Sequence, residues 1–364
     1  MAGETSQRGA ARPVLWWAAL GAVFLAVEIA LFTAWIVSGN AKPTPRGSTP
    51  VPGWMKVFDP AWEVFTVCAA ALFLYYVVIR PWRREGRITT NGIFTLVIAS
   101  LYWQDPFENY SGANWISNSN SINFGSWTSN IPGDLLGSSH KIPEPFVWGI
   151  PVYIVVLAGA AILGSKVLGR IKRHWPRLSA PSLVFICFGM FFVFDFVFEI
   201  PFLLLGFCSY PGAIKALTIF HGHYYQFPVY EAVFWGGTWS GFASVRYFVD
   251  RRGRMISERK VDEIKTTATR RTWLRTLSLI GVCNLIYLAG YNIPIQWFSE
   301  HPNAWPKDIV SRSYLMDGLC GPGTHYVCPG GSVPSAGARP LLPASTRGSI
   351  QPASLGSRNL RPAE

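Results

Sequence analysis

Residues 181–207 read PSLVFICFGMFFVFDFVFEIPFLLLGF, an apolar run with only two charged side chains, Asp195 and Glu199. A helix needs about 20 mostly apolar residues to cross the hydrocarbon core of a bilayer, so this run predicts a spanning helix. Six further apolar runs occur along the chain, at residues 14–37, 61–79, 88–103, 146–167, 227–248 and 273–291. The run at 88–103 is the shortest. The sequence therefore predicts an all-α, polytopic membrane bundle of about seven transmembrane helices.

The composition of the whole chain agrees with a membrane protein. Half of its 364 residues are hydrophobic, 15% are aromatic and only 14% are charged, against about 25% charged in an ordinary soluble domain. This excludes a disordered chain, and six cysteines are too few for a small disulfide scaffold. The net charge of +12 is also typical of nucleic-acid binders. The low charge density favours the bilayer as the partner, and no nucleic-acid partner is expected.

The distribution of basic residues predicts the orientation of the bundle. With the N-terminus in the cytoplasm, alternating helices place 20 of the 32 Lys and Arg on the cytoplasmic side and only five in the outside loops. Cytoplasmic loops carry the excess of basic residues in membrane proteins. We expect a multi-pass plasma-membrane protein with residues 1–13 as a cytoplasmic tail. Residues 14–294 form the transmembrane domain with an outside loop at 104–145, and 295–364 an outside tail, largely disordered from about residue 329.

Two cysteines in that tail, Cys320 and Cys328, lie close together in GLCGPGTHYVCPG. A disulfide between them is expected in an oxidising exterior. Two free thiols remain the alternative, because pairing is not readable from sequence alone.

Acidic residues inside the apolar runs are the main functional signal, because a carboxylate in the hydrocarbon core costs several kcal/mol. Asp195 and Glu199 are four residues apart, which places them on one helix face, and phenylalanines surround them. A carboxyl pair in such a dry site can hold a proton near neutral pH and act as an acid–base pair. The alternative is a protonated pair that bonds neighbouring helices. The other candidate catalytic residues lie towards the outer ends of the helices, with the histidines as proton relays: Asp105, Glu108, His221, His223 and Glu231.

The loop at 104–145 interleaves aromatic residues with Asn and Ser, a composition that suits a lid over a pocket. An ordinary interfacial aromatic loop is the alternative. Three aromatic residues of this loop, Tyr110, Trp115 and Trp127, are candidate substrate-binding residues. Glu28, Glu63 and Tyr225, which lie outside the loop, complete the candidate substrate-binding set. The HxH pair at 221–223 alone does not make a metal site. We therefore expect no metal and no other cofactor.

Three stretches of the sequence resemble the AveC-type spirocyclase family of actinobacteria. They are YWQDPFENY at 102–110 with the Asn/Ser/Trp loop that ends in NIPG, FVFEIPF at 196–202, and HYYQFPVYEAVFWGG at 223–237. The resemblance covers residues 14–294. It implies a polytopic membrane enzyme of secondary metabolism that closes a dihydroxy-ketone polyketide into a spiroketal and influences dehydration at that ring. It carries over no catalytic residues.

The leading prediction is a membrane-embedded, cofactor-free cyclase or dehydratase that uses acid–base chemistry on a hydrophobic polyketide or lipid-like hydroxy-ketone. A membrane terpene-type cyclase is one alternative, since it also needs buried carboxyls. A non-catalytic lipid-binding or proton-coupled transport protein is another. A proton path should carry acids on both sides of the midplane, whereas these acids gather towards one side. The expected partners are the bilayer and a hydrophobic small molecule, and the sequence sets no oligomeric state.

Overall fold

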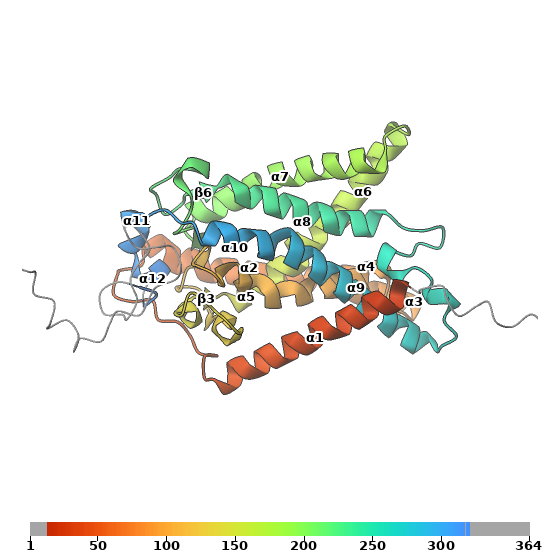
Figure 1. The fold of residues 1–364 in the computed structure, drawn as a ribbon, viewed down its shortest axis with the longest axis horizontal. Helices are drawn as coiled ribbons and strands as arrows, with labels where there is room; N and C mark the ends of the chain where they lie inside the picture. The colour runs from red at the N-terminus through yellow and green to blue at the C-terminus, as the bar shows by residue number, and fades with distance from the viewer. Residues whose placement is uncertain (1–12, 317, 321–364) are drawn as a thin grey trace, which may run out of the picture.

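The computed structural model describes residues 13–316 and 318–320 and is mostly helical (Figure 1). Five helices within this part are long and apolar enough to cross a membrane. Two are continuous, and three combine α-helices with one π-helical turn. The continuous ones are α1 (Pro13–Val37) and α7 (Ala180–Leu204). The span Gly53–Glu85 consists of α2 (Gly53–Leu74), η1 (Tyr75–Ile79) and α3 (Arg80–Glu85), and the span Phe146–His174 consists of α5 (Phe146–Val152), η5 (Tyr153–Leu157) and α6 (Ala158–His174). The span Ala268–Ser299 consists of α9 (Ala268–Tyr287), η9 (Leu288–Asn292) and α10 (Ile293–Ser299).

The two other expected spans differ from the prediction. Helix α4 (Thr90–Ser100) has 11 residues, so it is about 16 Å long and reaches only half of a hydrocarbon core of about 30 Å. It continues as a 3-10 helix, η2 (Leu101–Asn109). Helix α8 (Val229–Tyr247) has 19 residues, but its Glu, Arg, Ser, Thr and Gly residues lower its hydropathy. Five of the seven expected spans thus correspond to candidate membrane-spanning helices.

Close helix packing holds the bundle together. Helix α1 lies along α9, where a Cβ on Gly21 would come within 1.9 Å of the Leu277 carbonyl oxygen and one on Gly281 within 2.3 Å of the Trp17 oxygen. Small residues that let two backbones approach are typical of membrane helix pairs. Helix α7 packs against α8, which in turn packs on α6, and α2 packs on α5.

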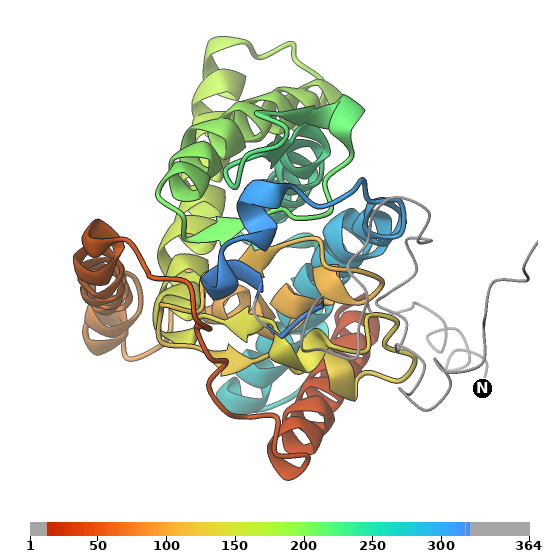
Figure 2. The same cartoon turned by 90° about the vertical axis from the view of Figure 1, so that its left-hand side faces the viewer.

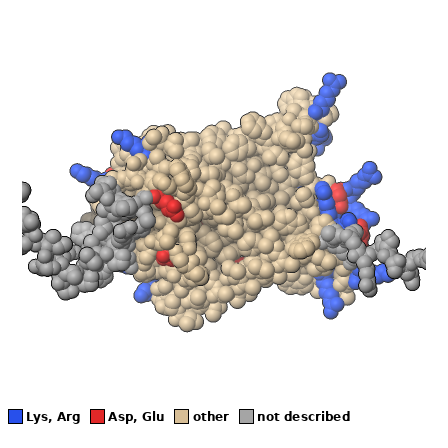
Figure 3. Space-filling model, viewed as in Figure 1, with Lys and Arg blue, Asp and Glu red and all other residues tan. Residues whose placement is uncertain are grey.

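The turns that the prediction assigns to the cytoplasm lie together at one end of this bundle. The segments that follow α3, α6 and α8 lie together at the right of Figure 1, whereas α11 (Lys307–Val310) and α12 (Ser313–Met316) lie at the left. Lys and Arg side chains gather at the ends of the molecule in Figure 3, and the face between them shows none. The common location of the three turns agrees with the predicted topology, whereas Lys and Arg occur at both ends. The choice of the cytoplasmic side, and of the plasma membrane, stays a prediction.

Loops fold over the other end as a compact cap, which faces the viewer in Figure 2. Three two-residue antiparallel strand pairs tie the cap together: β1 (Ile116–Ser117) with β4 (Cys208–Ser209), β2 (Phe124–Gly125) with β3 (Pro143–Glu144), and β5 (Thr218–Ile219) with β6 (Phe227–Pro228). Helices α11 and α12 pack on it through the buried Ile309, Tyr314 and Leu315. Short 3-10 turns complete the chain at Thr128–Asn130, Ser139–Lys141, Lys215–Leu217, Ile256–Glu258 and Val261–Glu263.

Candidate functional site

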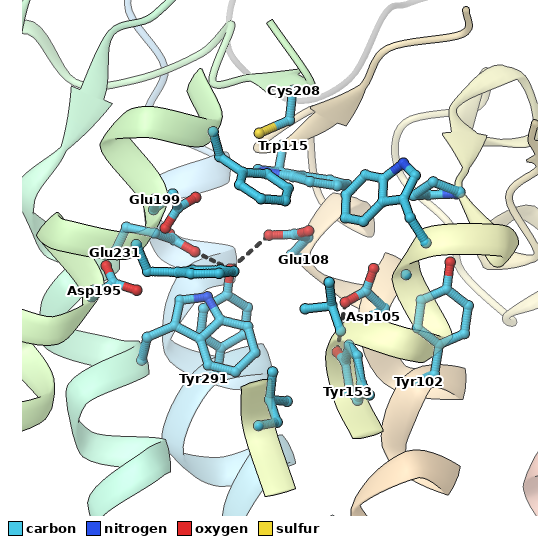
Figure 4. Close-up of a pocket in the computed structure, with 18 of the residues that line it drawn as sticks. Tyr102, Asp105, Glu108, Trp115, Tyr153, Asp195, Glu199, Cys208, Glu231 and Tyr291 are labelled. Atoms are coloured by element: carbon cyan, nitrogen blue, oxygen red, sulfur yellow. Dashed lines mark hydrogen bonds between the residues drawn. The ribbon is translucent and has the colours of Figure 1, made fainter. Parts of the chain in front are cut away.

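A cavity with a volume of about 90 Å³ lies between the cap and the helices beneath it (Figure 4). Its walls are largely aromatic, with Trp148, Phe198, Phe202, Trp235 and Trp239 among the lining residues. Five carboxyl groups also line it, and no Lys, Arg or His does. They are Asp105, Glu108, Asp195, Glu199 and Glu231. Five carboxylates in one apolar cavity repel one another too strongly to be ionised together.

Helix α7 supplies two of these carboxyls. Asp195 and Glu199 are buried, with 1% and 9% of their surfaces exposed, and both line the cavity as their four-residue spacing predicts. The Tyr210 hydroxyl donates a hydrogen bond to Glu199. Among the described residues, Oδ2 of Asp195 has no hydrogen-bond partner. Oε2 of Glu231 also has none among them, so these two carboxyls each have an oxygen left for a bound molecule.

Tyr291 links two further carboxyls, from opposite sides of the cavity. Its hydroxyl lies 2.6 Å from Oε2 of Glu108 and also bonds Oε1 of Glu231. A phenol has a single proton to donate, so it donates to one carboxyl and accepts from the other. One of the two carboxyls must then carry a proton. We call Glu108, Tyr291 and Glu231 the proton-sharing triad.

Asp105 has a different environment. It accepts a hydrogen bond of 2.5 Å from the Tyr153 hydroxyl, which lies 2.7 Å from the Tyr287 hydroxyl. Burial raises the pKa of Asp105 to about 6, against the opposing effect of the Tyr153 hydrogen bond. Burial, and next the charge of Glu231, raise the pKa of Glu108 well above its ordinary value. The cavity thus combines a carboxyl that ionises near pH 6 with one that stays protonated at higher pH.

Irregular backbone places these side chains. Tyr291 lies on the π-helical turn η9, and Tyr153 lies on η5. Single π-helical turns inside α-helices are frequent at functional sites. The η2 segment that carries Asp105 is fixed to α9, because Trp103 and Gln104 donate to Oδ1 of Asn284 over 2.8 and 2.6 Å.

The cap closes one side of the cavity. Strand β1 pairs with β4, so Trp115, which precedes β1, and Cys208, the first residue of β4, both lie over the carboxyl groups (Figure 4). Cys208 is a buried free thiol. Trp115 is the one loop aromatic of the predicted lid that lines the cavity. Trp127 is fully buried and donates to the Trp103 carbonyl oxygen, and Tyr110 donates to that of Pro132.

The model of the family described as spirocyclase AveC-like matches residues 82–315. The chain belongs to the AveC-like spirocyclase family. The match confirms the resemblance, although it begins after the expected residue 14 and extends past 294. All residues that line the cavity fall inside it. Comparison with curated proteins and with solved structures gave no match.

Six of the 13 predicted site residues of this AveC-like protein meet at the cavity: Asp105, Glu108, Trp115, Asp195, Glu199 and Glu231. The other seven lie elsewhere. His221 and His223 lie in the turn between β5 and β6, where the exposed His223 stacks on Tyr225 with ring centres 4.8 Å apart. Glu63 on α2 accepts a hydrogen bond from the Ile122 amide over 2.6 Å, and Glu28 lies on α1.

Sequence reasoning missed the tyrosines of the site. Tyr102, Tyr153, Tyr210 and Tyr291 all line the cavity, and three of them bond its carboxyls. A signal for one of them was present, since Tyr287 and Tyr291 are four residues apart in an apolar run, just as the two acids of α7 are. Within the described ranges, no three His, Cys, Asp or Glu side chains converge as around a metal ion. The predicted Cys320–Cys328 disulfide involves Cys328, which lies outside the described residues.

Proposed function

We propose that this AveC-like family member is a membrane-embedded cyclase that closes a hydrophobic hydroxy-ketone into a cyclic ketal by acid–base chemistry. The observation that carries the proposal is the apolar cavity lined by five carboxyl groups and no basic side chain. The family description supports a spirocyclase, and the five candidate spans support action on a substrate that partitions into the bilayer.

The reaction makes two demands on the cavity. One hydroxyl of the substrate adds to the ketone carbon, so a base must take the hydroxyl proton while an acid protonates the carbonyl oxygen. The resulting hemiketal hydroxyl is then protonated and leaves as water, and the second hydroxyl attacks the oxocarbenium ion and loses its proton. One ketone and two hydroxyls thus become a ketal and one water, and the protein recovers its protons. A nearby carboxylate stabilises the cationic intermediate.

The geometry supports a role for each carboxyl. Asp195, with its unpartnered oxygen, donates the proton to the departing oxygen, and Glu199 beside it is its acid–base partner. Asp105, which ionises near pH 6, accepts the hydroxyl proton. The proton-sharing triad holds a further proton within the same cavity and resupplies Asp195. Since neither His221 nor His223 lines the cavity, the mechanism does not use them.

The apolar walls serve the same chemistry. They exclude bulk water, which would otherwise trap the oxocarbenium ion, and they fix the orientation in which the second ring closes. The cavity volume of about 90 Å³ is smaller than the roughly 300 Å³ of ordinary ligand pockets. It accommodates the reacting carbons and oxygens, so the rest of a polyketide must extend outside the walls described.

The test is deletion of the gene, followed by complementation with the parent and with two isosteric variants. Asp195→Asn removes the proposed donor, and we expect conversion to fall by about 10²–10⁴-fold. The strain should then accumulate an acyclic hydroxy-ketone that is one water heavier than the product, as measured by mass spectrometry of lipid and polyketide extracts. Asp59→Asn is the matched control, because Asp59 is fully buried on a spanning helix but lies outside the cavity.

Two results contradict the proposal. One is an extract that does not change when the gene is deleted, which removes the cyclase function. The other is full conversion by Asp195→Asn at the parental protein level, which removes the role of Asp195.

A further inference from the structure

A second cavity-like feature lies at the opposite end of the bundle, where α6 and α8 end. It is a groove of about 430 Å³ whose lining includes Ser165, Tyr247 and four basic side chains, and no Asp or Glu. The basic side chains are Lys166, Arg170, Arg173 and Arg246. We call it the basic groove. The cyclase proposal makes no use of it.

Helix geometry brings these cations together. Lys166, Arg170 and Arg173 follow one another at spacings of four and three residues, so they share one face of α6. Arg246 comes from the last turn of α8, which packs against α6. Gly169 leaves space between them: a Cβ at this position would lie 3.7 Å from Nη1 of Arg173 and 3.8 Å from the Tyr247 ring.

The positive charge of the groove is not neutralised within the described part of the chain. Lys166, Arg170 and Arg173 make no ion pair or hydrogen bond there, and Arg246 donates only to the neutral Asn91, over 2.8 Å. The acid that acts on Arg246 is Glu258. Its carboxylate is already engaged by Arg275 at 2.7 Å.

We propose that the basic groove binds a phosphate group. Guanidinium groups present several N–H donors in a planar fork that matches phosphate oxygens, and three arginines and a lysine exceed the charge of one phosphate. The neighbouring surface is apolar: Leu163, one turn before Lys166 on α6, is 61% exposed, and Val249 is 40% exposed. A phosphate carried by an anionic lipid can lay its acyl chains on this surface, whereas free phosphate cannot. Basic pockets between membrane helices recognise lipid head groups in this way.

The experiment measures binding to the purified full-length protein in neutral detergent. Phosphatidylglycerol, phosphatidylcholine and inorganic phosphate are titrated separately, and native mass spectrometry counts the bound molecules. The groove variant is Arg170→Gln with Arg173→Gln. The matched control is Arg83→Gln with Arg84→Gln, which removes the same charge from exposed arginines of α3. Both pairs lie on the protein surface, so both variants should fold, and size-exclusion chromatography checks this.

We expect the parent and the control to bind phosphatidylglycerol with equal affinity. Removal of two groove arginines should weaken binding about 25-fold, at about fivefold for each basic side chain near an anionic head group. Inorganic phosphate that displaces the lipid at equal affinity would support the phosphate site but assign it to a free anion. The proposal is overturned if the groove variant binds phosphatidylglycerol as tightly as the control, or if the parent retains phosphatidylcholine equally well.

Discussion

The replacement Tyr291→Phe tests the proton-sharing triad most directly, because it removes one oxygen atom and preserves the ring. In the parent, that oxygen bonds both Glu108 and Glu231 inside the cavity. A buried polar group that loses its hydrogen-bond partner costs about 1–3 kcal/mol, which in a transition state is about 5- to 150-fold in rate. Loss of proton transfer costs at least about 10²-fold. We therefore expect conversion to fall about 10²-fold, and not to vanish, because Asp195 and Asp105 remain.

The assay uses membranes from the complemented deletion strain. The acyclic compound that accumulates in that strain serves as substrate, and the initial rate of its loss is followed by mass spectrometry. Tyr314→Phe is the matched control: this tyrosine is also buried, and its hydroxyl accepts a hydrogen bond from Arg312 over 2.8 Å outside the cavity. A parental rate for Tyr291→Phe, at equal protein abundance, refutes the triad. Equal losses in both variants would indicate a general effect of removing a buried hydroxyl.

Three further predictions concern charge and packing. If Asp105 must be ionised to accept a proton, its pKa of about 6 predicts that conversion falls tenfold for each pH unit below about 6; a flat pH–rate profile down to about pH 4 contradicts this. Gly21→Val should push α1 away from α9 and lower the free energy of unfolding by about 1–3 kcal/mol or more, as measured by thermal unfolding. Gly189→Val on α7 is the control, because this position has open space around it, and it should not lower the stability by that amount. Arg275→Gln leaves the fully buried Glu258 without its ion-pair partner and should lower the free energy of unfolding by about 3–5 kcal/mol. Arg87→Gln removes an exposed ion pair and should lower it by under about 1 kcal/mol. Similar shifts in melting temperature for the two variants would refute this difference.

The spanning helices were predictable because hydropathy over about 20 residues decides them. The predicted run 146–167 became Phe146–His174, and 181–207 became Ala180–Leu204. The clearer of the two exceptions is 88–103, where α4 stops at Ser100 and the chain tightens into a 3-10 helix that contains Pro106. A proline removes a backbone donor and disfavours a continuing α-helix. The proline in YWQDPFENY was a signal of this interruption. The prediction rested on the hydropathy of the preceding run and did not use that signal.

The acidic part of the site was predictable and its partners were not. An acid in an apolar run stands out from its neighbours, which is why Asp195, Glu199 and Glu231 were found. A tyrosine in such a run does not, because its ring is apolar and only its hydroxyl is polar. Tyr210 and Trp115 lie in loops, where a long-range contact such as the β1–β4 pairing decides the position. The predicted His221 and His223 do not line the cavity, because proximity in sequence to Glu231 did not place them beside it.

The contrast between two buried carboxyl environments explains why the cavity uses phenols. Glu258, at the basic end, is fully buried and paired with the guanidinium of Arg275. A guanidinium partner places a fixed positive charge beside the carboxyl group. In the cavity, Tyr210 and Tyr291 supply hydrogen bonds to carboxyls without a fixed positive charge, as the proposed proton transfer needs. The same chain therefore pairs a buried acid with a guanidinium at one end and buried acids with phenols at the other, and the second arrangement suits the proposed role of proton donor.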